Sequence, residues 1–337
     1  MSVTVRSFAK INLGLCIGSP RPDGFHELLT VYQTIGLHDR IQVGIGPGSG
    51  IEIRCADPRV PRDETNTCYR IAERAMRAMG AKGRILIEIE KRLPVQGGLG
   101  GASANAVATL LGLEQVAKKA LPLSEKLRIA AEVGSDLPLF LVGGTVLGFG
   151  RGQQVYPLPD LPAIPCVMIT PEVGVSTPKA FAEWDRRQTA ELRSAGQPIA
   201  AVPSRTSTKL TATQPSDRMS ELGYGLSAWL GEQYSGAPFG RGRAENPLLA
   251  LVRAGIKNDF EQVVFPEYPE LGEAKAALLR AGAKYASLSG SGSTLYGLFA
   301  SKAAAVLAVK RLRKLGWAAQ ATATLGRRAY WRRVFAR

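Results

Sequence analysis

The stretch PVQGGLGGASANAVATLLGL, residues 94–113, places four glycines within residues 97–101 in front of an Ala-rich apolar run. Glycine costs conformational entropy on folding and packs no side chain, so such a cluster marks a backbone that turns sharply or is closely approached. The apolar run predicts a helix that begins near Ala102 or Ser103. Because the first N–H groups of a helix have no intrahelical partner, the loop predicts a site for an anion such as phosphate.

The same glycine pattern also fits a simple turn in which Ser103 caps the helix. It is not a Walker A loop, because that motif needs a Lys and none lies between Leu93 and Val116. A Rossmann fingerprint fits in part through Gly98 and Gly100. However, Ser103 occupies the third small position, and no strand ending in an acidic residue follows about 20 residues later. Nucleotide binding is therefore one interpretation of the loop, in a fold that uses neither the Walker A nor the Rossmann motif.

Composition bounds the class of protein. The chain has 337 residues, of which 45% are hydrophobic, so it can bury a large core and is expected to form about two domains. Its 43 Lys and Arg against 28 Asp and Glu give a net charge of +15, which favours anionic partners: nucleic acid, an acidic membrane surface or phosphorylated small molecules. We interpret the basic cluster near the C-terminus as a solvated face rather than a binding stripe. It comprises Lys302, Lys310, Arg311, Arg313, Lys314, Arg327, Arg328, Arg332, Arg333 and Arg337.

Cysteine and histidine usage argues against a zinc site and against a disulfide framework. The four cysteines show no C-x-x-C spacing, and there are two histidines. The N-terminus has no unbroken apolar stretch of signal-peptide length, and no segment approaches the roughly 18 apolar residues of a membrane span. A reducing cytoplasm is therefore the expected location.

Alternating patterns predict a mixed α/β unit before residue 150 and a second one after a Pro-rich connection, YPLPDLPAIP, at 156–165. We therefore expect domains at 1–160 and 161–337. Residues 186–215 are rich in Ser, Thr, Gln, Ala and Pro, and we interpret them as a mobile insertion. The expected strands lie at 3–17, 28–37, 51–55, 84–91, 166–170 and within 287–299. The expected helices lie at 66–79, 178–184, 246–254, 270–281 and 302–315.

Lys10 and Asn12 place two polar side chains in the apolar segment SFAKINLGL, residues 7–15. On a strand, Phe8, Lys10, Asn12 and Gly14 share one face. Such a pair is costly to bury without partners. One interpretation is an edge strand with its polar face in water. The other is a cation and an amide that project together into a cleft.

Asp136 precedes an apolar run in GSDLPLFLVGG, residues 134–144, and is expected to be partly buried. It either caps the following turn or needs a cationic partner, for which Lys10 is a candidate.

Three further segments carry weaker signals. Residues 21–28, RPDGFHEL, contain a turn signal followed by Phe25 and His26, and a lone His is more often structural than functional. Thr177 precedes a proline and is a good helix N-cap. Residues 288–294, LSGSGST, form a second small-residue loop suited to the approach of an anion.

Together these segments resemble the GHMP kinases, the family of the galactose, homoserine, mevalonate and phosphomevalonate kinases. The resemblance rests on the order and spacing of five motifs and covers about 3–150, 166–181 and 258–325. It implies an α/β (α+β) fold of two domains: a ribosomal-protein-like N-terminal domain and a C-terminal α/β sandwich domain, with the active cleft between them. The motifs are AKINLGL (9–15), DGFHEL (23–28), PVQGGLGGASANA (94–106), GSDLP (134–138) and LSGSGST (288–294).

The resemblance also implies an activity: phosphorylation, by ATP with Mg²⁺, of the tertiary 2-hydroxyl of a cytidine diphosphate methylerythritol in the non-mevalonate isoprenoid pathway. It implies that Asp136 orients this hydroxyl and accepts its proton, and that Lys10 holds Asp136 ionised and stabilises the transferred phosphoryl group. The residues implied to wrap the phosphates of ATP are Pro94, Val95, Gln96, Gly97, Gly98, Leu99, Gly100, Gly101, Ala102, Ser103 and Ala104. Those implied to bind the acceptor are Asn12, Phe25, His26, Thr177, Phe181, Gly290, Ser291 and Gly292. No protein ligand of the metal is implied.

Three positions depart from the family pattern. Where the loop commonly reads G-G-G-S-S, residues 100–104 read G-G-A-S-A, which leaves Ser103 as the candidate hydroxyl for phosphate or magnesium. Phe25 stands where Tyr is common, so aromatic packing survives without the hydroxyl.

Two other classes of function compete with a kinase. A dinucleotide-dependent oxidoreductase lacks the acidic residue on a following strand. A basic RNA-binding module is favoured by the charge, but few aromatic residues are interleaved with the basic cluster. We therefore expect small-molecule partners, no nucleic acid and no membrane, in a monomer or weak homodimer.

Overall fold

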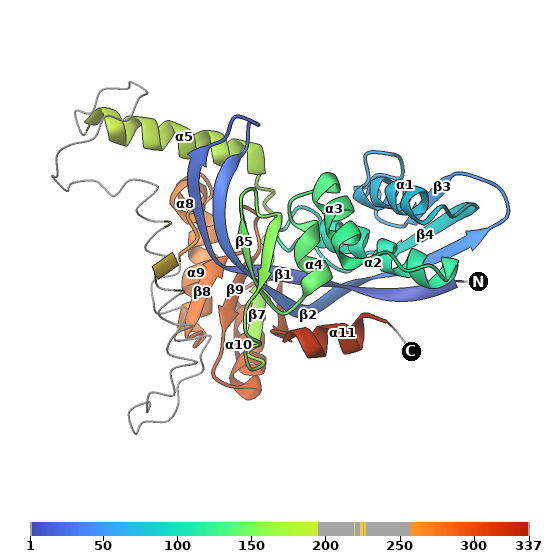
Figure 1. Ribbon diagram of the computed structural model, residues 1–337. Coiled ribbons are helices and arrows are strands. Elements are labelled where there is room, and N and C mark those ends of the chain that lie inside the picture. The colour runs from blue at the N-terminus through green and yellow to red at the C-terminus, as the bar shows by residue number, and fades with distance from the viewer. Residues whose placement is uncertain (1, 195–218, 220–222, 225, 227–256, 336–337) are drawn as a thin grey trace, which may run out of the picture.

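The computed structural model describes residues 2–194, 219, 223–224, 226 and 257–335, and its strands form two sheets (Figure 1). The first sheet has the order β3-β4-β2-β5-β6, and β1 pairs with β2 outside this path. All its pairs are antiparallel except β3 with β4, which are parallel neighbours. Its strands are β1 (Ser2–Pro20), β2 (His26–Gly46), β3 (Ile51–Cys55), β4 (Arg84–Glu90), β5 (Thr145–Phe149) and β6 (Gln154–Pro157).

Four helices accompany the first sheet and bury its core. Asn66 caps α1 by accepting a hydrogen bond from the backbone N–H of Cys68, as the predicted start at residue 66 requires. Helix α2 is apolar on nearly all sides and packs against β1, β2 and α1, which is typical of a buried helix. The helices are α1 (Thr67–Met79), α2 (Gly101–Ala117), α3 (Leu123–Val133) and α4 (Leu137–Val142).

The second sheet is antiparallel, with the order β10-β7-β9-β8, and both of its faces are covered. On β7, Val167 and Ile169 pack into the core formed with the neighbouring helices. Cys166 and Met168 alternate with them and pack toward β1 and β2 of the first sheet. The strands are β7 (Pro165–Ile169), β8 (Tyr285–Leu288), β9 (Leu295–Leu298) and β10 (Ala319–Ala323), and the helices are α5 (Thr177–Ser194), α8 (Glu261–Glu267), α9 (Pro269–Arg280) and α10 (Lys302–Lys314).

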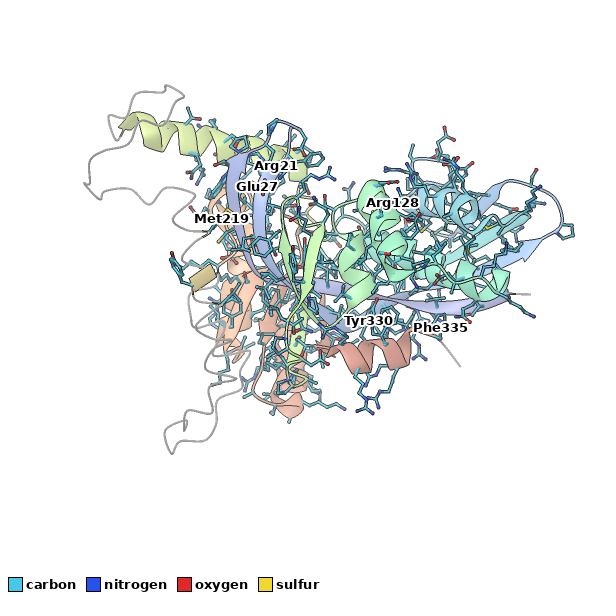
Figure 2. The ribbon with its side chains drawn as sticks, viewed as in Figure 1. Arg21, Glu27, Arg128, Met219, Tyr330 and Phe335 are labelled. Carbon is cyan, nitrogen blue, oxygen red and sulfur yellow. The ribbon has the colours of Figure 1, made fainter. Side chains whose placement is uncertain are left out.

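Helix α11 (Arg327–Val334) returns from the second sheet to the first core. Tyr330 is buried there and donates a hydrogen bond of 2.7 Å to the carbonyl oxygen of Phe140, while Phe335 forms a β-bridge with Val5. Figure 2 shows Tyr330 and Phe335 along this helix, beneath the first sheet. By its contacts α11 belongs to the first core, although the predicted division at residue 160 places it in the second domain.

The mixed α/β prediction is confirmed, and the segment predicted as an insertion differs at its start. Helix α5 continues through residues 186–194, and Glu183 pairs with Arg186 and Arg187 one turn later at the start of this stretch. The rest of that segment and the helix predicted at 246–254 lie outside the described residues. None of the described helices is long and apolar enough to cross a membrane.

Candidate active site

Lys10 lies at the centre of the candidate site, on β1, and is 3% exposed. Its ammonium group donates to Asn12 Oδ1 at 2.7 Å and to the carbonyl oxygen of Gly98 at 2.9 Å. The nearest carboxylate oxygen of Asp136 lies 3.5 Å from the same nitrogen. The three donors of one ammonium therefore join β1, the glycine loop and the N-terminus of α4.

Asn12 supports this arrangement from the same face of β1. It is buried, and its amide nitrogen donates to Thr30 Oγ1, which in turn donates to the carbonyl oxygen of Gly14. The interpretation of Lys10 and Asn12 as a solvent-facing edge is therefore wrong, since both side chains are buried and partnered. Bulges of β1 on either side of the pair leave Lys10 and Asn12 as neighbours but interrupt the simple alternation expected from Phe8 to Gly14.

Asp136 precedes α4, but its side chain makes no capping hydrogen bond. It accepts instead from the hydroxyl of Tyr32 at 3.0 Å and remains about one-third exposed. Burial, with Asp136 beside it, raises the pKa of Tyr32 well above 10.0, so this hydroxyl stays protonated and donates. The carboxylate is thus held by two buried groups and keeps one side open to a substrate.

The glycine loop leads into α2 as the sequence predicts, although the helix starts at Gly101, slightly earlier than expected. Its N-cap is Gly100 in the left-handed region, with φ of 68°, so the interpretation of Ser103 as the cap is wrong. A Cβ on Gly100 would lie 3.1 Å from Lys10 Cγ and 3.0 Å from Phe140. This glycine therefore makes room for the side chain of Lys10.

The loop at residues 289–294 packs directly on the glycine loop. A Cβ on Gly98 would lie 2.0 Å from the Ser289 carbonyl oxygen, and one on Gly292 would lie 2.2 Å from the Gly98 nitrogen. Ser289 also donates to the Gly98 carbonyl oxygen at 2.9 Å. Gly290 lies beside Lys10, since its Cβ would be 3.4 Å from the ammonium nitrogen. The two glycine-rich motifs therefore form one layer of backbone around Lys10.

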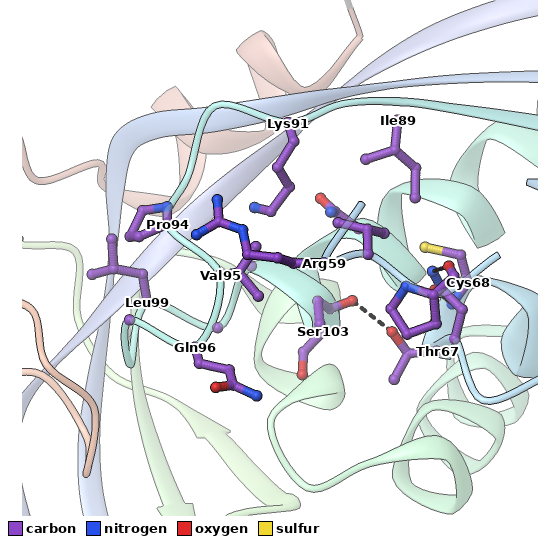
Figure 3. A pocket seen from close by; sticks show the side chains of 18 of the residues that line it. Arg59, Thr67, Cys68, Ile89, Lys91, Pro94, Val95, Gln96, Leu99 and Ser103 are labelled. Atoms are coloured by element: carbon purple, nitrogen blue, oxygen red, sulfur yellow. Dashed lines mark hydrogen bonds between the residues drawn. The ribbon is translucent and has the colours of Figure 1, made fainter. Parts of the chain in front are cut away.

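A cavity of about 330 Å³ lies along the outer side of the glycine loop (Figure 3). Its walls are residues 94–103 and the segment around the N-terminus of α1. Ile89 on β4, Lys91 just after β4 and Asn105 on α2 complete the lining. Thr67 donates to the carbonyl oxygen of Ala102 across the wall. The residues of this cavity that sequence reasoning missed are Arg59, Val60, Pro61, Thr65, Asn66, Thr67, Cys68, Ile89, Lys91 and Asn105.

A second group of predicted residues meets where α5 crosses the tip of the β1–β2 hairpin (Figure 1). The ring of His26 stacks on Phe181 with centroids 4.8 Å apart, and its Nε2 lies 2.7 Å from Asp185 Oδ1. Phe25 is 48% exposed, and the guanidinium of Arg151 lies 4.7 Å from its ring centroid. The structure therefore brings Phe181 and His26 together and leaves Phe25 as the most accessible aromatic face of the group.

Thr177 connects this second group to the centre of the site. Its hydroxyl lies 2.6 Å from that of Ser291, in the loop that packs on Gly98. Helix α5 is thereby tied at its first residue to the loops around Lys10.

The residues in contact with these groups that the sequence did not single out are Tyr32, Lys91, Asn105, Arg151 and Asp185. Their signals were weak, because each is a single polar residue in an ordinary strand, loop or helix. Lys91 follows directly after β4, and a cation shortly before a glycine loop was the one cue available.

The chain matches two family descriptions: "GHMP kinases N terminal domain" over residues 66–144 and "GHMP kinases C terminal" over residues 244–316. It is 37% identical over 308 residues to the 4-diphosphocytidyl-2-C-methyl-D-erythritol kinase of Solibacter usitatus (strain Ellin6076), covering 91% of this chain and 84% of the relative. It is also 37% identical over 313 residues to the enzyme of that name from Synechococcus sp. (strain JA-2-3B'a(2-13)), covering 92% and 89%.

A solved structure agrees with these relatives. The crystal structure of a 4-(cytidine 5'-diphospho)-2C-methyl-D-erythritol kinase superposes with a TM-score of 0.68 at 28% identity, and the match covers 96% of this chain and 99% of that one. The chain therefore belongs to the GHMP kinases, within the group of 4-diphosphocytidyl-2-C-methyl-D-erythritol kinases.

Proposed function

We propose that this chain transfers the γ-phosphoryl group of ATP to the tertiary 2-hydroxyl of 4-(cytidine 5'-diphospho)-2-C-methyl-D-erythritol. The relatives bearing that enzyme's name support the reaction. The observation that carries the chemistry is the pairing of a buried ammonium, Lys10, with an accessible carboxylate, Asp136, beside a glycine loop at a helix N-terminus. Such a site positions an alcohol and neutralises charge on a phosphoryl group, which is what this kind of reaction requires.

ATP fits the loop and the cavity next to it. Gly98 and Gly100 both have φ in the left-handed region, which turns the loop into the N-terminus of α2, where backbone N–H groups favour phosphate. Lys91 adds a buried cation, with its ammonium nitrogen 3.3 Å from the position of a Cβ on Gly101. We place the phosphates along residues 97–103 and the nucleoside in the cavity lined by Lys91 and Asn105.

Magnesium would be held mainly by the phosphates and by water. The described residues contain no group of three or more His, Cys, Asp or Glu able to hold a metal ion, but the cleft has a hard oxygen ligand in Asp136 and the hydroxyl of Ser103 on the cavity wall. Those donors suit Mg²⁺, which keeps several waters when it binds with phosphate. When bound, the ion would neutralise charge on the phosphates.

Asp136 is proposed to orient the acceptor hydroxyl and to take its proton as the new O–P bond forms. Tyr32 holds one carboxylate oxygen, so the carboxylate cannot rotate freely and presents its accessible side to the alcohol. Lys10 is proposed to stabilise the phosphoryl group in transit, since its ammonium lies between Asp136 and the glycine loop.

The cytidine end of the acceptor is proposed to lie against the aromatic group at the hairpin tip. Phe25 offers an accessible ring, and Phe181 and His26 form a stacked pair next to it. Thr177 and Ser291 supply hydroxyls between this group and Lys10. Asn12, Gly290 and Gly292 complete the proposed acceptor pocket, with glycines where side chains would crowd Lys10 or the glycine loop. A cytoplasmic location and a monomeric or weakly dimeric state remain predictions from the sequence.

The test of this function is ATP consumption against a panel of alcohols. We expect turnover with the cytidine diphosphate methylerythritol and at least about a hundredfold lower kcat/KM with mevalonate, homoserine or galactose, which lack the cytidine group. Cytidine diphosphate should inhibit competitively against the acceptor and not against ATP. Equal turnover of mevalonate or homoserine would contradict the proposed acceptor while leaving the kinase assignment intact.

The pH dependence of turnover tests Lys10. Burial lowers the pKa of Lys10 below its ordinary 10.5, and the nearby Asp136 carboxylate opposes this shift in part. Since Lys10 acts as an ammonium, kcat should fall as the pH rises through this lowered pKa, on an alkaline limb that lies below pH 10.5. In Lys10→Arg the residual kcat should lack that limb, because a guanidinium stays charged beyond about pH 12.

The contribution of Lys10 to the free energy of unfolding should change with pH in the opposite direction to kcat. Between the lowered pKa and 10.5 the unfolded chain binds more protons at Lys10 than the folded one, so this residue's contribution to the free energy of unfolding rises with pH. Deprotonation of Lys10 therefore cannot lower the activity at alkaline pH by unfolding the protein. An identical alkaline limb in the wild type and in Lys10→Arg would rule out the assigned role.

A further inference from the structure

The net charge of the chain is concentrated in its last 64 residues. After Glu273 the sequence contains no Asp or Glu, but it contains 13 of the 43 Lys and Arg, so this segment supplies +13 of the net charge of +15. The first 273 residues are nearly balanced, with 30 basic and 28 acidic residues. The interpretation of the C-terminal cluster as a solvated face does not account for this separation, because such faces usually mix charges of both signs. A one-sided charge favours an anionic partner.

The phosphates of the proposed substrates do not account for this charge either. The cations assigned to them, Lys10 and Lys91, belong to the balanced part of the sequence. The cavity beside the glycine loop is lined by residues 59–105, so none of the cations after Glu273 lies on its walls. The C-terminal cations are therefore available to a different anion.

Helices α10 and α11 carry most of these cations on one side of the molecule. Figure 1 shows α11 beneath the first sheet and α10 beneath the second, both at the lower side of the view. Among the described residues, Arg327 is the one cation of the two helices that pairs with a carboxylate, that of Asp160. The others are exposed, and no carboxylate in the described part of the chain neutralises them: Lys302, Lys310, Arg311, Arg313, Lys314, Arg328, Arg332 and Arg333.

Exposed apolar side chains lie among the cations of α10. Val306 and Leu307 are 43% and 49% exposed. Together with Ala303, Lys302 and Lys310, they line an open hollow of about 460 Å³ on the outer side of the helix. A single exposed apolar residue is common on protein surfaces, but here two adjacent ones lie between two lysines. The outer face of α10 is therefore both apolar and cationic.

The shape and chemistry of this face distinguish between the classes of anionic partner. All residues that line the hollow belong to α10, so no second described element forms a groove that would hold a strand or helix of another protein. A nucleic acid offers phosphates to the cations, but its charged backbone gives Val306 and Leu307 no apolar surface. An anionic lipid bilayer offers both, since its headgroups attract Lys and Arg and its acyl boundary accepts apolar side chains.

We propose that the outer face of α10, together with α11, is a docking surface for an anionic lipid bilayer. Val306 and Leu307 enter the boundary between headgroups and acyl chains, and the cations of both helices contact the headgroups. The helix lies against the bilayer and does not cross it. The β1–β2 hairpin tip and α5 lie at the upper side of Figure 1, so docking leaves the proposed acceptor end of the active site open. This inference is independent of the proposed phosphoryl transfer.

The test is co-sedimentation of the full chain with lipid vesicles. The wild type should bind vesicles of about one quarter phosphatidylglycerol in phosphatidylcholine at least about tenfold more tightly than vesicles of phosphatidylcholine alone. Binding should weaken as NaCl is raised from about 0.1 M to about 0.5 M, because salt screens the attraction between exposed charges. Failure to bind the anionic vesicles at about 0.1 M NaCl would overturn the proposal.

Two variants separate the charged contribution from the apolar one. Replacing Lys302, Lys310 and Lys314 together by Gln should weaken binding to the anionic vesicles about a hundredfold, or about fivefold for each charge removed. Val306→Ser with Leu307→Ser leaves the net charge unchanged and should weaken binding about tenfold. Both variants alter exposed side chains, so each should keep the wild-type melting temperature and kcat. An unchanged affinity in the double serine variant would mean that any polyanion suffices, and would overturn the proposal.

The matched control replaces Arg54, Arg77 and Lys82 by Gln. These exposed residues lie on β3, on α1 and just after α1, so the control removes the same charge from another part of the molecule. It should change the affinity for anionic vesicles by less than about twofold. A loss as large as that of the triple lysine variant would show attraction to net charge alone and overturn the proposal. Tighter binding to a random single-stranded RNA than to the vesicles, unaffected by the double serine variant, would assign the surface to nucleic acid and overturn it as well.

Discussion

Asp136→Asn is expected to lower kcat by at least about a thousandfold, while the Kd for ATP changes by no more than a few fold. The carboxamide has the shape of the carboxylate, and its oxygen can still accept from Tyr32, so the fold around α4 should persist. It cannot take a proton from the acceptor hydroxyl at neutral pH. The loss should therefore appear in the chemical step, measured as kcat alongside ATP binding by calorimetry.

Asp160→Asn is a suitable control for this substitution. Asp160 is similarly exposed, at 41% of its side chain, and accepts from the backbone N–H of Arg327. It contacts none of the residues around Lys10 in the described structure, so its loss should reduce stability slightly and leave kcat unchanged. A kcat for Asp136→Asn within tenfold of the wild type would remove Asp136 from the proton transfer.

Gly98→Ala is expected to raise the Kd for ATP at least about tenfold, to lower kcat, and to cost more than about 2 kcal/mol of unfolding free energy. Its φ of 76° disfavours any side chain, and the new Cβ would lie 2.0 Å from the Ser289 carbonyl oxygen. The loop must move to relieve this overlap. The Gly98 carbonyl, which accepts from Lys10 and Ser289, would move with it.

Gly80→Ala separates the effect of backbone strain from the effect of overlap with the neighbouring loop. Gly80 also has a positive φ, 57°, but nothing lies within 4 Å of its added Cβ at the end of α1. It should cost about 1 kcal/mol from backbone strain alone and leave ATP binding unchanged. Similar losses in the two variants would mean that the contact between the two glycine loops contributes little.

The sequence predicted best those features of the fold that depend on neighbouring residues alone. Helix α1 begins at its capping residue Asn66, and α2 follows the glycine cluster, because capping and apolar runs are properties of neighbouring residues. Lys10 and Asn12 were recognised as a pair because two residues apart on a strand share a face. Lys10 was a candidate partner for Asp136 because a buried carboxylate needs a cation, and the family resemblance implied that the two act together. Their separation of 3.5 Å depends on the fold.

The rest depended on contacts between distant segments. Asp39 gives no sequence signal of its own, and its four donors come from the loop after β4 and from α2. The sequence predicted that an anion approaches Gly98 and Gly292. In the structure, a side chain on either glycine would also overlap the backbone of the other glycine-rich loop. Composition suggested an insertion from residue 186, but α5 extends to Ser194, with an ion pair between Glu183 and Arg186 across the predicted start.

The return of α11 to the first core has a consequence for the order in which the protein is made. Tyr330 and Val334 are buried in that core, and Phe335 bridges to Val5, near the beginning of the chain. Domains generally fold as they emerge from the ribosome, N-terminal segments first. Here the core of the first sheet is completed only by α11, which is synthesised after the whole second sheet. Until then the apolar surface around Phe8 and Phe140 that α11 covers stays open to chaperones.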